Sequence, residues 1–321
     1  AIWAIFFLWS SVRLLILKYY ILNSMKQRVI VTGGAGFIGS YVVNALIDNE
    51  YDVLVLDNLS TGKKSNINEK AVLKICDIRD YESIAYIFKK DDIVFHLAAL
   101  VSVPKSIEDP LLSNEINIRG TYNVLEAARA AGARGVIISS SAAVYGNQEG
   151  AVTEDTPTSP QTPYALQKKM KEDLGRLYAE LYSLPVIALR YFNVYGPLHH
   201  EEGSYAPVIA KFLKQKREGV PFTLVGDGMQ TRDFIHVRDV AQANIKSIPY
   251  LDKKLFSICN VASNTAVTVK EIAKMIDSSR ECIYLPPRIE VKNSQGDNKK
   301  IKNELGWSPT ITLAHGIEEL L

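Results

Sequence analysis

Short runs of β-branched and apolar residues alternate along the chain with stretches whose apolar positions recur every three or four residues. The runs read RVIVTG, DVLVLD, AVLKIC, DIVFHL, GVIISS and PVIALR, and they fall between about residues 28 and 191. Such runs predict buried strands, and the stretches between them predict helices. Because strand and helix alternate, the pattern predicts an α/β fold, a doubly wound parallel sheet with right-handed crossovers.

Beyond residue 192 the alternation is less regular. Helices are expected near 205–217 and 239–248, and short strands near 222–225 and 255–260. This part of the chain is expected to form a smaller C-terminal lobe against the edge of the first domain. We therefore divide the chain into a domain of residues 25–191 and a lobe of residues 192–321, from which some chain returns to the first domain.

The first 24 residues are strongly apolar and do not continue this pattern. Arg13 and Lys18 interrupt them, so the uninterrupted apolar run is only about half of the roughly 20 residues that a membrane span needs. Met25 stands directly before the first strand. We interpret Met25 as the start of the protein and residues 1–24 as an apolar extension outside the fold. A signal anchor is the alternative interpretation, with the positive charge from Arg13 onward in the cytosol.

Composition and charge narrow the class of protein. The chain has 321 residues, of which 47% are hydrophobic, and its net charge is +2, which argues against nucleic acid as a partner. Cys76, Cys259 and Cys282 are odd in number and far apart, so they indicate neither a disulfide framework nor a metal site. We expect a cytoplasmic protein that holds no metal.

A glycine-rich segment follows the first strand. Val29–Thr32 runs directly into GGAGFIGS and then into an apolar-periodic stretch, with glycine at Gly33, Gly36 and Gly39. In a strand–turn–helix unit this spacing serves a tight turn, the close approach of a pyrophosphate, and tight helix–strand packing. The segment therefore predicts a dinucleotide site in a Rossmann-type domain.

An acidic residue ends each of the next two strands. Asp57 lies 24 residues after Gly33, where a carboxylate can accept both ribose hydroxyls and would repel a 2′-phosphate. This favours NAD over NADP, and a role for Asp57 in initiating the turn before Asn58 is compatible with it. Asp77 ends the third strand and could meet the adenine.

Residues 139–146 read SSSAAVYG, and residues 164–168 read YALQK. Tyr164 and Lys168 are four residues apart and share one face of a predicted helix, which by itself indicates no more than a solvated face. The serines, however, end a strand at the carboxyl edge of the sheet, where ligands bind in open α/β folds. Beside a cofactor loop, this arrangement predicts a catalytic site.

The motifs taken together resemble those of a known enzyme family. They are TGGAGFIGS, VLDNLSTG, FHLAA, SVPKSIEDP, SSSAAVYG, YALQK, RYFNVYGP and TRDFIHVRDVA, and they extend from about residue 26 to the end of the chain. The sequence is similar to the extended short-chain dehydrogenase/reductases, and among them to the NAD-dependent nucleotide-sugar epimerases and dehydratases, in particular the UDP-glucose and UDP-N-acetylglucosamine 4-epimerases.

The resemblance implies roles for three residues. Tyr164 would act as a phenolate base on the 4-hydroxyl of the sugar, Ser141 would relay its proton, and Lys168 would hold the nicotinamide ribose. A free tyrosine has a pKa of about 10, and Lys168 together with a positive nicotinamide ring would draw it toward neutrality. Hydride transfer to NAD and back through a 4-keto sugar would then invert C4.

The resemblance also implies a set of residues that contact NAD. They are Gly33, Gly36, Phe37, Ile38, Gly39, Asp57, Asn58, Ser60, Gly62, Asp77, Ile78, Leu97, Ala98, Ala99, Ser139, Tyr164, Lys168 and Tyr191.

For the UDP-sugar, the resemblance implies contacts from both parts of the chain. Arg232 and Arg288 match two diphosphate-contacting positions, although a surface ion pair is an alternative for each. Ser294 aligns with a position that controls room for the 2-substituent, so a small side chain there would admit an N-acetyl group. The other expected contacts are Ser102, Val103, Ser141, Asn193, Val208, Leu224 and Val225.

Two alanines distinguish this sequence from those of similar enzymes that catalyse other reactions. Similar dehydratases carry Asp-Glu where Ala142 and Ala143 stand, and similar decarboxylases tend to carry Glu at the position of Ala143. An epimerase is therefore expected. The alternatives are a UDP-glucuronate decarboxylase or epimerase, a 4-keto reductase, or a non-catalytic NAD-binding protein. The resemblance further implies a homodimer formed through helices near 110–131 and 161–183.

Overall fold

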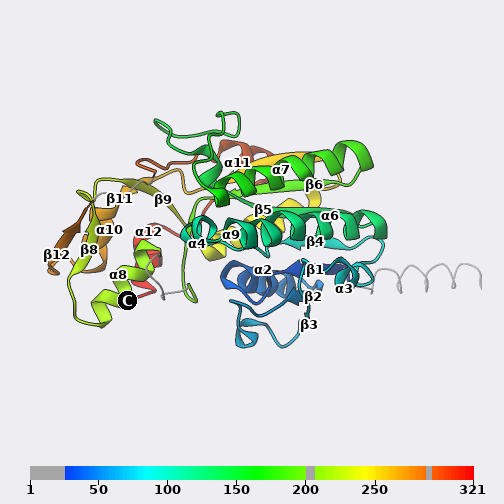
Figure 1. The fold of residues 1–321 in the computed structure, drawn as a ribbon. Coiled ribbons are helices and arrows are strands. Elements are labelled where there is room, and N and C mark those ends of the chain that lie inside the picture. Colours follow the sequence, from blue (N-terminus) through cyan, green and yellow to red (C-terminus); the bar gives the residue numbers. More distant parts are fainter. Residues whose placement is uncertain (1–25, 200–206, 287–290) are drawn as a thin grey trace, which may run out of the picture.

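The main part of the molecule is a parallel sheet with helices on both faces (Figure 1). The computed structural model describes residues 26–199, 207–286 and 291–321, so the expected extension of residues 1–24 lies outside the described residues. Seven strands cross the sheet in the order β10 (Phe256–Val261), β6 (Val186–Tyr191), β5 (Gly135–Ser141), β4 (Ile93–His96), β1 (Arg28–Thr32), β2 (Asp52–Asp57) and β3 (Val72–Ile75). The expected doubly wound α/β fold is confirmed.

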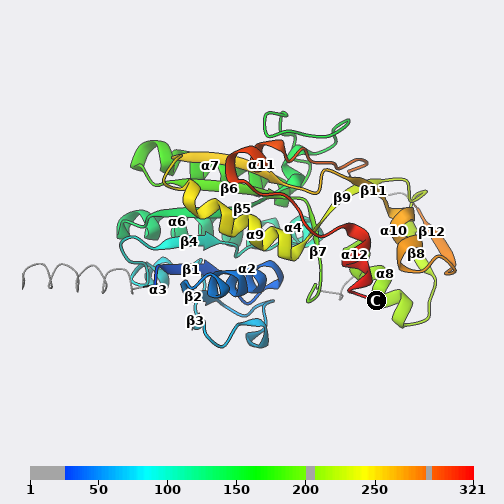
Figure 2. The same cartoon turned by 180° about the vertical axis from the view of Figure 1, so that it is seen from behind.

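Each face of the sheet has its own apolar core. Val29 and Val31 of β1 pack in one buried cluster with residues of α2 (Phe37–Asp48), α9 (Val237–Ser247) and α11 (Lys299–Leu305). Ile30, between them, packs in the other cluster with α3 (Tyr81–Ala85), α6 (Gly120–Ala131) and α7 (Pro163–Tyr182). Figure 1 shows the α6 and α7 face, and Figure 2 shows the α2 and α9 face. Burial on both faces explains why the strands read as continuous apolar runs.

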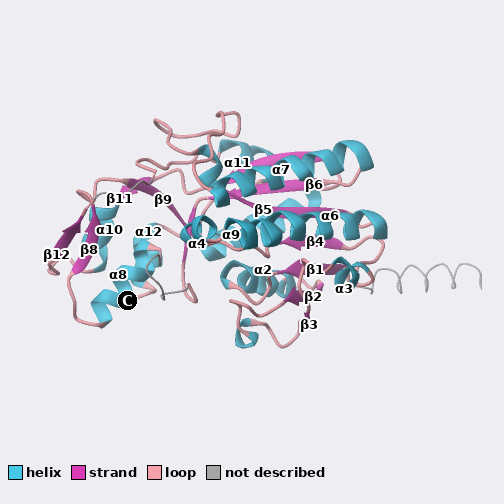
Figure 3. Cartoon of the chain, in the orientation of Figure 1, coloured by secondary structure: helices cyan, strands magenta, loops and turns pink. Residues whose placement is uncertain are grey.

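A smaller lobe lies beyond one end of the sheet (Figure 3). It contains a three-stranded sheet of β7 (Asn193–Tyr195), β9 (Thr231–His236) and β11 (Ala266–Thr268), and a pair of β8 (Phe222–Val225) and β12 (Cys282–Leu285). The helices α8 (Val208–Arg217), α10 (Val269–Ile276) and α12 (Leu313–Glu318) pack with these strands around a third apolar core. β8 has the bounds expected from the sequence.

One strand lies in a different place from that expected. The strand near 255–260 was assigned to the smaller lobe, but β10 pairs in parallel with β6 at the edge of the large sheet. Its residues Cys259 and Val261 are fully buried in the core of the large domain. The helix expected near 239–248, α9, packs in the same core, so the chain returns to the first domain in α9 and stays there through this strand.

The carboxyl ends of the strands face the smaller lobe. β6 ends at Tyr191 and β7 begins at Asn193, so a single residue joins the large sheet to the small one. Among the residues that the structure describes, no helix combines the length and the apolarity needed to cross a bilayer. The candidate site lies where the two parts of the chain meet.

Candidate functional site

The turn between β1 and α2 has glycine where a side chain would collide with backbone. Gly33 has φ +73°, in the left-handed region, and a Cβ atom on Gly39 would lie 2.0 Å from the carbonyl oxygen of Gly33. The helix therefore packs directly on the strand, as expected of the third glycine. The N-cap residue Gly36 has no side chain to accept from the first N–H groups of the 12-residue helix α2, so these donors are left for another acceptor.

The same turn leaves room for an anion. Within 4 Å, a Cβ atom on Gly36 would meet the carbonyl oxygen of Gly33 at 3.3 Å and otherwise open space, as far as the described residues reach. The helix start combines free N–H groups with the positive end of the helix dipole. The turn therefore fits the pyrophosphate of a dinucleotide.

Asp57, at the end of β2, directs its carboxylate toward this turn. Its Oδ2 atom accepts from the backbone N–H of Ala35 (3.0 Å), and its Oδ1 atom accepts from that of Leu59 (2.8 Å). A carboxylate has about four acceptor positions, so two remain for hydroxyl donors such as those of a ribose. The bond to Leu59 shows that Asp57 also initiates a turn, so the two interpretations of this residue are compatible.

Other residues predicted for the cofactor border the turn. A Cβ atom on Gly62 would lie 2.8 Å from Ala35, and a Cβ atom on Gly33 would lie 2.7 Å from the backbone nitrogen of Ala98. The segments after β2 and β4 therefore both approach the glycine turn. They carry the predicted contacts Asn58, Ser60, Gly62, Leu97, Ala98 and Ala99.

Asp77 and Tyr191 already have partners in the protein. Arg79, through hydrogen bonds and its charge, lowers the pKa of Asp77 to about 2, so this carboxylate is ionised at neutral pH. The Asn58 side chain also donates to Asp77 (2.9 Å). The hydroxyl of Tyr191 donates to Asn244 of α9 (2.9 Å), so its proton is not available to a ligand.

The start of α7 is fixed by local sequence. Thr162 accepts from the backbone N–H of Ala165 (3.2 Å), and Pro163 occupies the first turn, where its missing N–H costs nothing. The buried hydroxyl of Ser106 in α4 (Val103–Glu108) accepts from the backbone N–H of Tyr164 (3.2 Å). Tyr164 therefore enters the helix in a defined position.

Ser141, Tyr164 and Lys168 meet at the carboxyl end of β5. The Ser141 side chain lies within hydrogen-bonding reach of the Tyr164 hydroxyl and acts to lower its pKa. The Lys168 Nζ atom lies 5.6 Å from the centre of the Tyr164 ring, and it donates to the carbonyl oxygen (3.0 Å) and the hydroxyl (3.3 Å) of Ser139. An ammonium group has three donors, so one remains for a ligand. The structure thus brings together the three residues predicted to be catalytic.

Burial is the largest influence on the pKa values of Tyr164 and Lys168. It raises the pKa of Tyr164, and the hydrogen bond from Ser141 acts in the opposite direction. It also lowers the pKa of Lys168 to about 8, against the charge of Glu172. We expected Lys168 to draw the pKa of Tyr164 toward neutrality. Among the protein's own groups the balance is the reverse, because the burial of the phenol outweighs its hydrogen bond with Ser141.

The predicted substrate residues lie on both sides of the junction. Ser102 caps α4 by accepting from the Lys105 N–H (3.3 Å), and Val103 begins that helix. Asn193 donates to the carbonyl oxygen of Asp233 (2.9 Å). Val208 begins α8. The Leu224 side chain is fully buried in the core of the smaller lobe, so only its backbone can face a ligand, whereas the next residue of β8 is half-buried.

Arg232 and Ser294 lie on neighbouring segments. The Thr231 N–H donates to the carbonyl oxygen of Lys292 (2.9 Å), so β9 and the segment 291–297 run side by side. The Arg232 Nη1 atom donates to the carbonyl oxygen of Thr231 (2.8 Å). Ser294 is half-buried. Arg288 lies outside the described residues.

Two residues with a place in this site were missed at the level of sequence. Asp233 accepts from Ser263 and Asn264 in the turn after β10 and from the Gly296 N–H (3.1 Å), so it ties β9 to the segment that carries Ser294. Burial raises the pKa of Asp233 to about 6. Its position beside Arg232 in TRDFIHVRDVA was a usable signal.

Asn117 is the second missed residue. It lies in a π-helical turn, Glu115–Arg119, and its amide accepts from the Leu100 N–H (2.8 Å) and donates to the Leu100 carbonyl (3.0 Å). Its amide also donates to Gln167 of α7 (2.8 Å). Asn117 therefore holds the segment after β4 against the catalytic helix. The helical period that predicts helices near 110–131 gives no sign of the π-turn, although such turns are frequent at functional sites.

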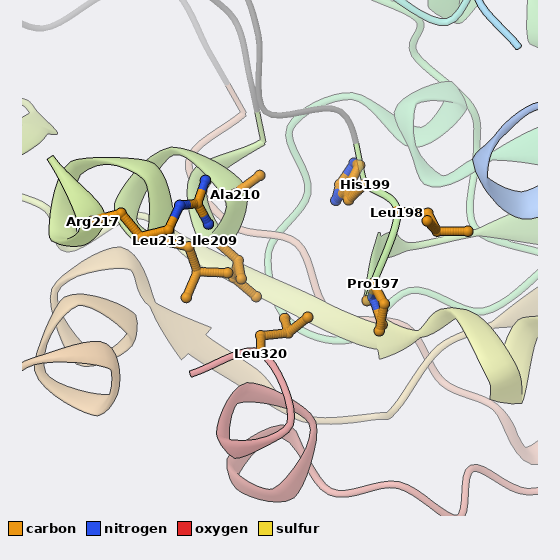
Figure 4. A pocket seen from close by; sticks show the side chains of 9 residues that line it. Pro197, Leu198, His199, Ile209, Ala210, Leu213, Arg217 and Leu320 are labelled. Atoms are coloured by element: carbon orange, nitrogen blue, oxygen red, sulfur yellow. The ribbon is translucent and has the colours of Figure 1, made fainter. Parts of the chain in front are cut away.

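A small cavity of about 70 Å³ lies between the loop after β7 and α8 (Figure 4). Pro197 and His199 lie on one side of it, Leu213 of α8 on another, and Leu320 closes it from the C-terminal segment. The His199 ring stacks on the ring of Phe37 at the start of α2, with centroids 4.5 Å apart. The predicted cofactor residue Phe37 is thereby linked to the loop that leads into the smaller lobe.

Comparison with known proteins gives one family match. Residues 29–262 match the model of the NAD dependent epimerase/dehydratase family. Over 301 residues the chain is 40% identical to a protein of Methanocaldococcus jannaschii described as a putative UDP-glucose 4-epimerase, covering 91% of this chain and 97% of the other. It is also 33% identical over 319 residues to a UDP-N-acetyl-alpha-D-glucosaminuronate decarboxylase of Bacillus cytotoxicus, covering 92% and 97%.

A solved structure has the same fold over nearly the whole chain. It is the UDP-N-acetylglucosamine 4-epimerase from Methanobrevibacter ruminantium in complex with UDP-N-acetylmuramic acid. The TM-score is 0.86 and the sequence identity is 36%, covering 92% of this chain and 97% of the other.

Proposed function

The chain belongs to the NAD dependent epimerase/dehydratase family, and we propose that it interconverts the C4 epimers of a UDP-hexose with bound NAD. The observation that carries this proposal is the meeting of Ser141, Tyr164 and Lys168 at the end of β5, beside a glycine turn that fits a pyrophosphate. The activity of the relative from Methanocaldococcus jannaschii, as its description gives it, supports the same reaction.

In this proposal, the residues of the chain bind, orient and move a proton. Tyr164, as phenolate, accepts the proton of the sugar's 4-hydroxyl. The Ser141 hydroxyl forms a hydrogen bond with the same 4-hydroxyl and holds it in place. Lys168 uses its remaining donor on the nicotinamide ribose. NAD, when bound, supplies a reversible hydride acceptor, so the reaction consumes none of it. Inversion requires the 4-keto sugar to present its other face while the rest of the site holds UDP.

The residues after Ser141 favour epimerisation over related reactions. Ala142 and Ala143 form the turn that follows β5, and the Ala143 N–H donates to the Ser141 hydroxyl (3.2 Å). Neither alanine can supply the extra acid and base that a dehydratase needs. The second candidate is a UDP-glucuronate decarboxylase, and a relative described as a decarboxylase of the related UDP-N-acetyl-alpha-D-glucosaminuronate keeps it in view.

The test is to incubate the purified protein with UDP-Glc, UDP-GlcNAc or UDP-GlcA, one at a time, and to identify the products by NMR. We expect a 4-epimer from the first two substrates, with no net change in NAD. Release of carbon dioxide from UDP-GlcA, or a dehydrated sugar, would replace the epimerase assignment and leave the family and the cofactor in place.

We propose that the substrates include UDP-GlcNAc and UDP-GalNAc as well as UDP-Glc and UDP-Gal, because Ser294 is small. Ser294→Tyr is expected to abolish epimerisation of the N-acetyl sugars, since the ring would fill the space for the 2-substituent, and to spare the other pair. Rates on both pairs measure this, with Ser294→Ala as the control that keeps both. Loss of both activities, or of neither, would contradict the role of Ser294.

We also propose that the protein is a homodimer in the cytoplasm. Leu166, Met170, Leu177 and Leu181 are between 39% and 68% exposed, and their spacing places them along one face of α7. Tyr122 of the neighbouring helix α6 is 47% exposed. A second copy of these two helices would cover the face.

All three cysteines are free, which suits a reducing compartment such as the cytoplasm.

The double variant Leu177→Glu/Leu181→Glu is expected to be monomeric, because two carboxylates would have to be buried in the interface. Light scattering coupled to size-exclusion chromatography gives the mass. Val72→Glu is the matched control, since Val72 is 60% exposed on the edge strand β3, far from α7 in the sheet order. A double variant that keeps the mass of the wild type would place the interface elsewhere.

A further inference from the structure

A buried polar network runs across three strands next to the catalytic residues. Ser140 of β5, Arg190 of β6 and Asn260 of β10 are register partners. The Arg190 guanidinium forms a fork with Glu172 of α7, with Nε–Oε1 at 2.8 Å and Nη2–Oε2 at 2.7 Å. The two side chains are only 3% and 1% exposed. The Ser140 hydroxyl donates to the same carboxylate at 2.5 Å.

The ion pair between Glu172 and Arg190 lies next to the predicted catalytic residues. Glu172 follows Lys168 by one helical turn, so the two side chains are neighbours on α7. The residues on either side of Ser140 are Ser139, which accepts from Lys168, and Ser141, which binds Tyr164. The carboxylate is therefore fixed by the same strand end that carries the catalytic contacts.

The surroundings of Lys168 explain why a carboxylate is needed there. Lys171 is also buried and donates to the carbonyl oxygen of His96 (3.1 Å), and burial and the neighbouring lysines lower the pKa of His96. A buried ammonium is costly unless an opposite charge lies nearby. The titratable and charged groups that pack around Lys168 and Glu172 are Tyr164 and Lys171 on α7, His96 on β4, Arg190 on β6, Tyr145 in the turn after β5, and Glu154.

We propose that Glu172 is a positioning residue for Lys168: its carboxylate, held by Arg190 and Ser140, keeps the neighbouring ammonium charged and directed at Ser139, beside Tyr164. The inference rests on the proposed function only in that Lys168 assists Tyr164. Arg190 fixes the carboxylate, and the charge of Glu172 acts on the lysine.

The test is the pH dependence of kcat/KM in the wild type and in Glu172→Gln. Lys168 must be protonated, so activity falls as pH rises past its pKa of about 8. Removing the carboxylate charge lowers this pKa further, so the falling limb is expected to move about one pH unit toward acid. At pH 8 the variant then loses about 5-fold in kcat/KM, and the loss approaches about 10-fold at pH 9. At pH 6 its rate approaches that of the wild type.

Two further variants separate charge from structure. Glu172→Asp keeps the charge and is expected to return the limb toward that of the wild type. Ser140→Ala removes a hydrogen bond to Glu172 but no charge, so the limb should stay in place. A loss by the same factor at every pH in Glu172→Gln would make the residue structural only and would overturn the proposal.

Glu172→Gln leaves Arg190 buried without a counter-charge, which can prevent folding. The double variant Glu172→Gln/Arg190→Gln removes both charges and is expected to move the limb in the same direction by a smaller amount, because the loss of the Arg190 cation partly offsets the loss of the Glu172 anion. An unshifted limb in a folded double variant would again overturn the proposal.

NMR of protein labelled with ¹³C-lysine follows the titration of Lys168 without turnover, with the signal assigned by its absence in Lys168→Arg. The expected result is a lower pKa in Glu172→Gln than in the wild type. If the wild type is not an epimerase but the titration shifts, the proposed function fails and the role of Glu172 stands. If the wild type is an epimerase and the titration does not shift, only the role of Glu172 fails.

Discussion

A Tyr164→Phe variant is expected to lose about 10³-fold in kcat for epimerisation while it keeps its fold and its NAD. The ring and its packing remain, and what is lost is the hydroxyl that accepts the sugar's proton. Removing a group that transfers a proton in the rate-limiting step typically costs 10²- to 10⁴-fold. Initial rates followed by NMR, together with the NAD content of the purified variant, measure the effect.

The matched control for this variant is Tyr182→Phe. Tyr182 lies on the same helix and is 51% exposed, so the loss of its hydroxyl should leave kcat unchanged. If Tyr164→Phe kept a tenth or more of the activity, another group would have to be the base. Loss of NAD together with activity would indicate a role in holding the cofactor instead.

Gly39→Ala is expected to abolish NAD binding, because the new methyl group would lie 2.0 Å from the carbonyl oxygen of Gly33. Backbone cannot move aside as the end of a flexible side chain can, so α2 would have to shift away from β1. The turn that fits the pyrophosphate would then be lost, and the core between helix and sheet would loosen. NAD content per chain after gel filtration and the thermal unfolding temperature measure the two effects.

Gly36→Ala separates these effects. A Cβ atom on Gly36 meets a single protein atom at 3.3 Å and otherwise open space, as far as the described residues reach. This variant should unfold near the wild-type temperature and still lose NAD, because its methyl group takes the space of the phosphates. Retention of NAD by Gly36→Ala would show that the cofactor does not approach the turn at this glycine.

The large sheet was predictable because strand runs and helical stretches alternate so regularly before residue 192. The partner of a late strand was not. A run at 255–260 indicates a strand, but its neighbour depends on packing between residues far apart in sequence. β10 joins β6 across the intervening residues 192–255.

The site residues show the same limit. The four-residue spacing of Tyr164 and Lys168 predicts their shared face, and the serines at the strand end predict where they meet. Burial is set by the whole fold, so the raised pKa of Tyr164 and the role proposed for Glu172 were not visible in a motif. The bonds that Asn117 makes to Leu100 likewise belong to tertiary structure.

The single residue between β6 and β7 is one of several places where the chain passes from the large sheet to the smaller lobe. The chain returns in α9, crosses again between β10 and β11, returns in α11 and ends in α12. The smaller lobe is therefore a discontinuous domain, built from several separate segments of the chain. It cannot be exchanged as one continuous segment, because each crossing between the lobe and the large domain would need its own junction. New substrate preferences in such an architecture are therefore more accessible through single substitutions in the segments that border the site, such as 291–297, than through recombination of whole domains.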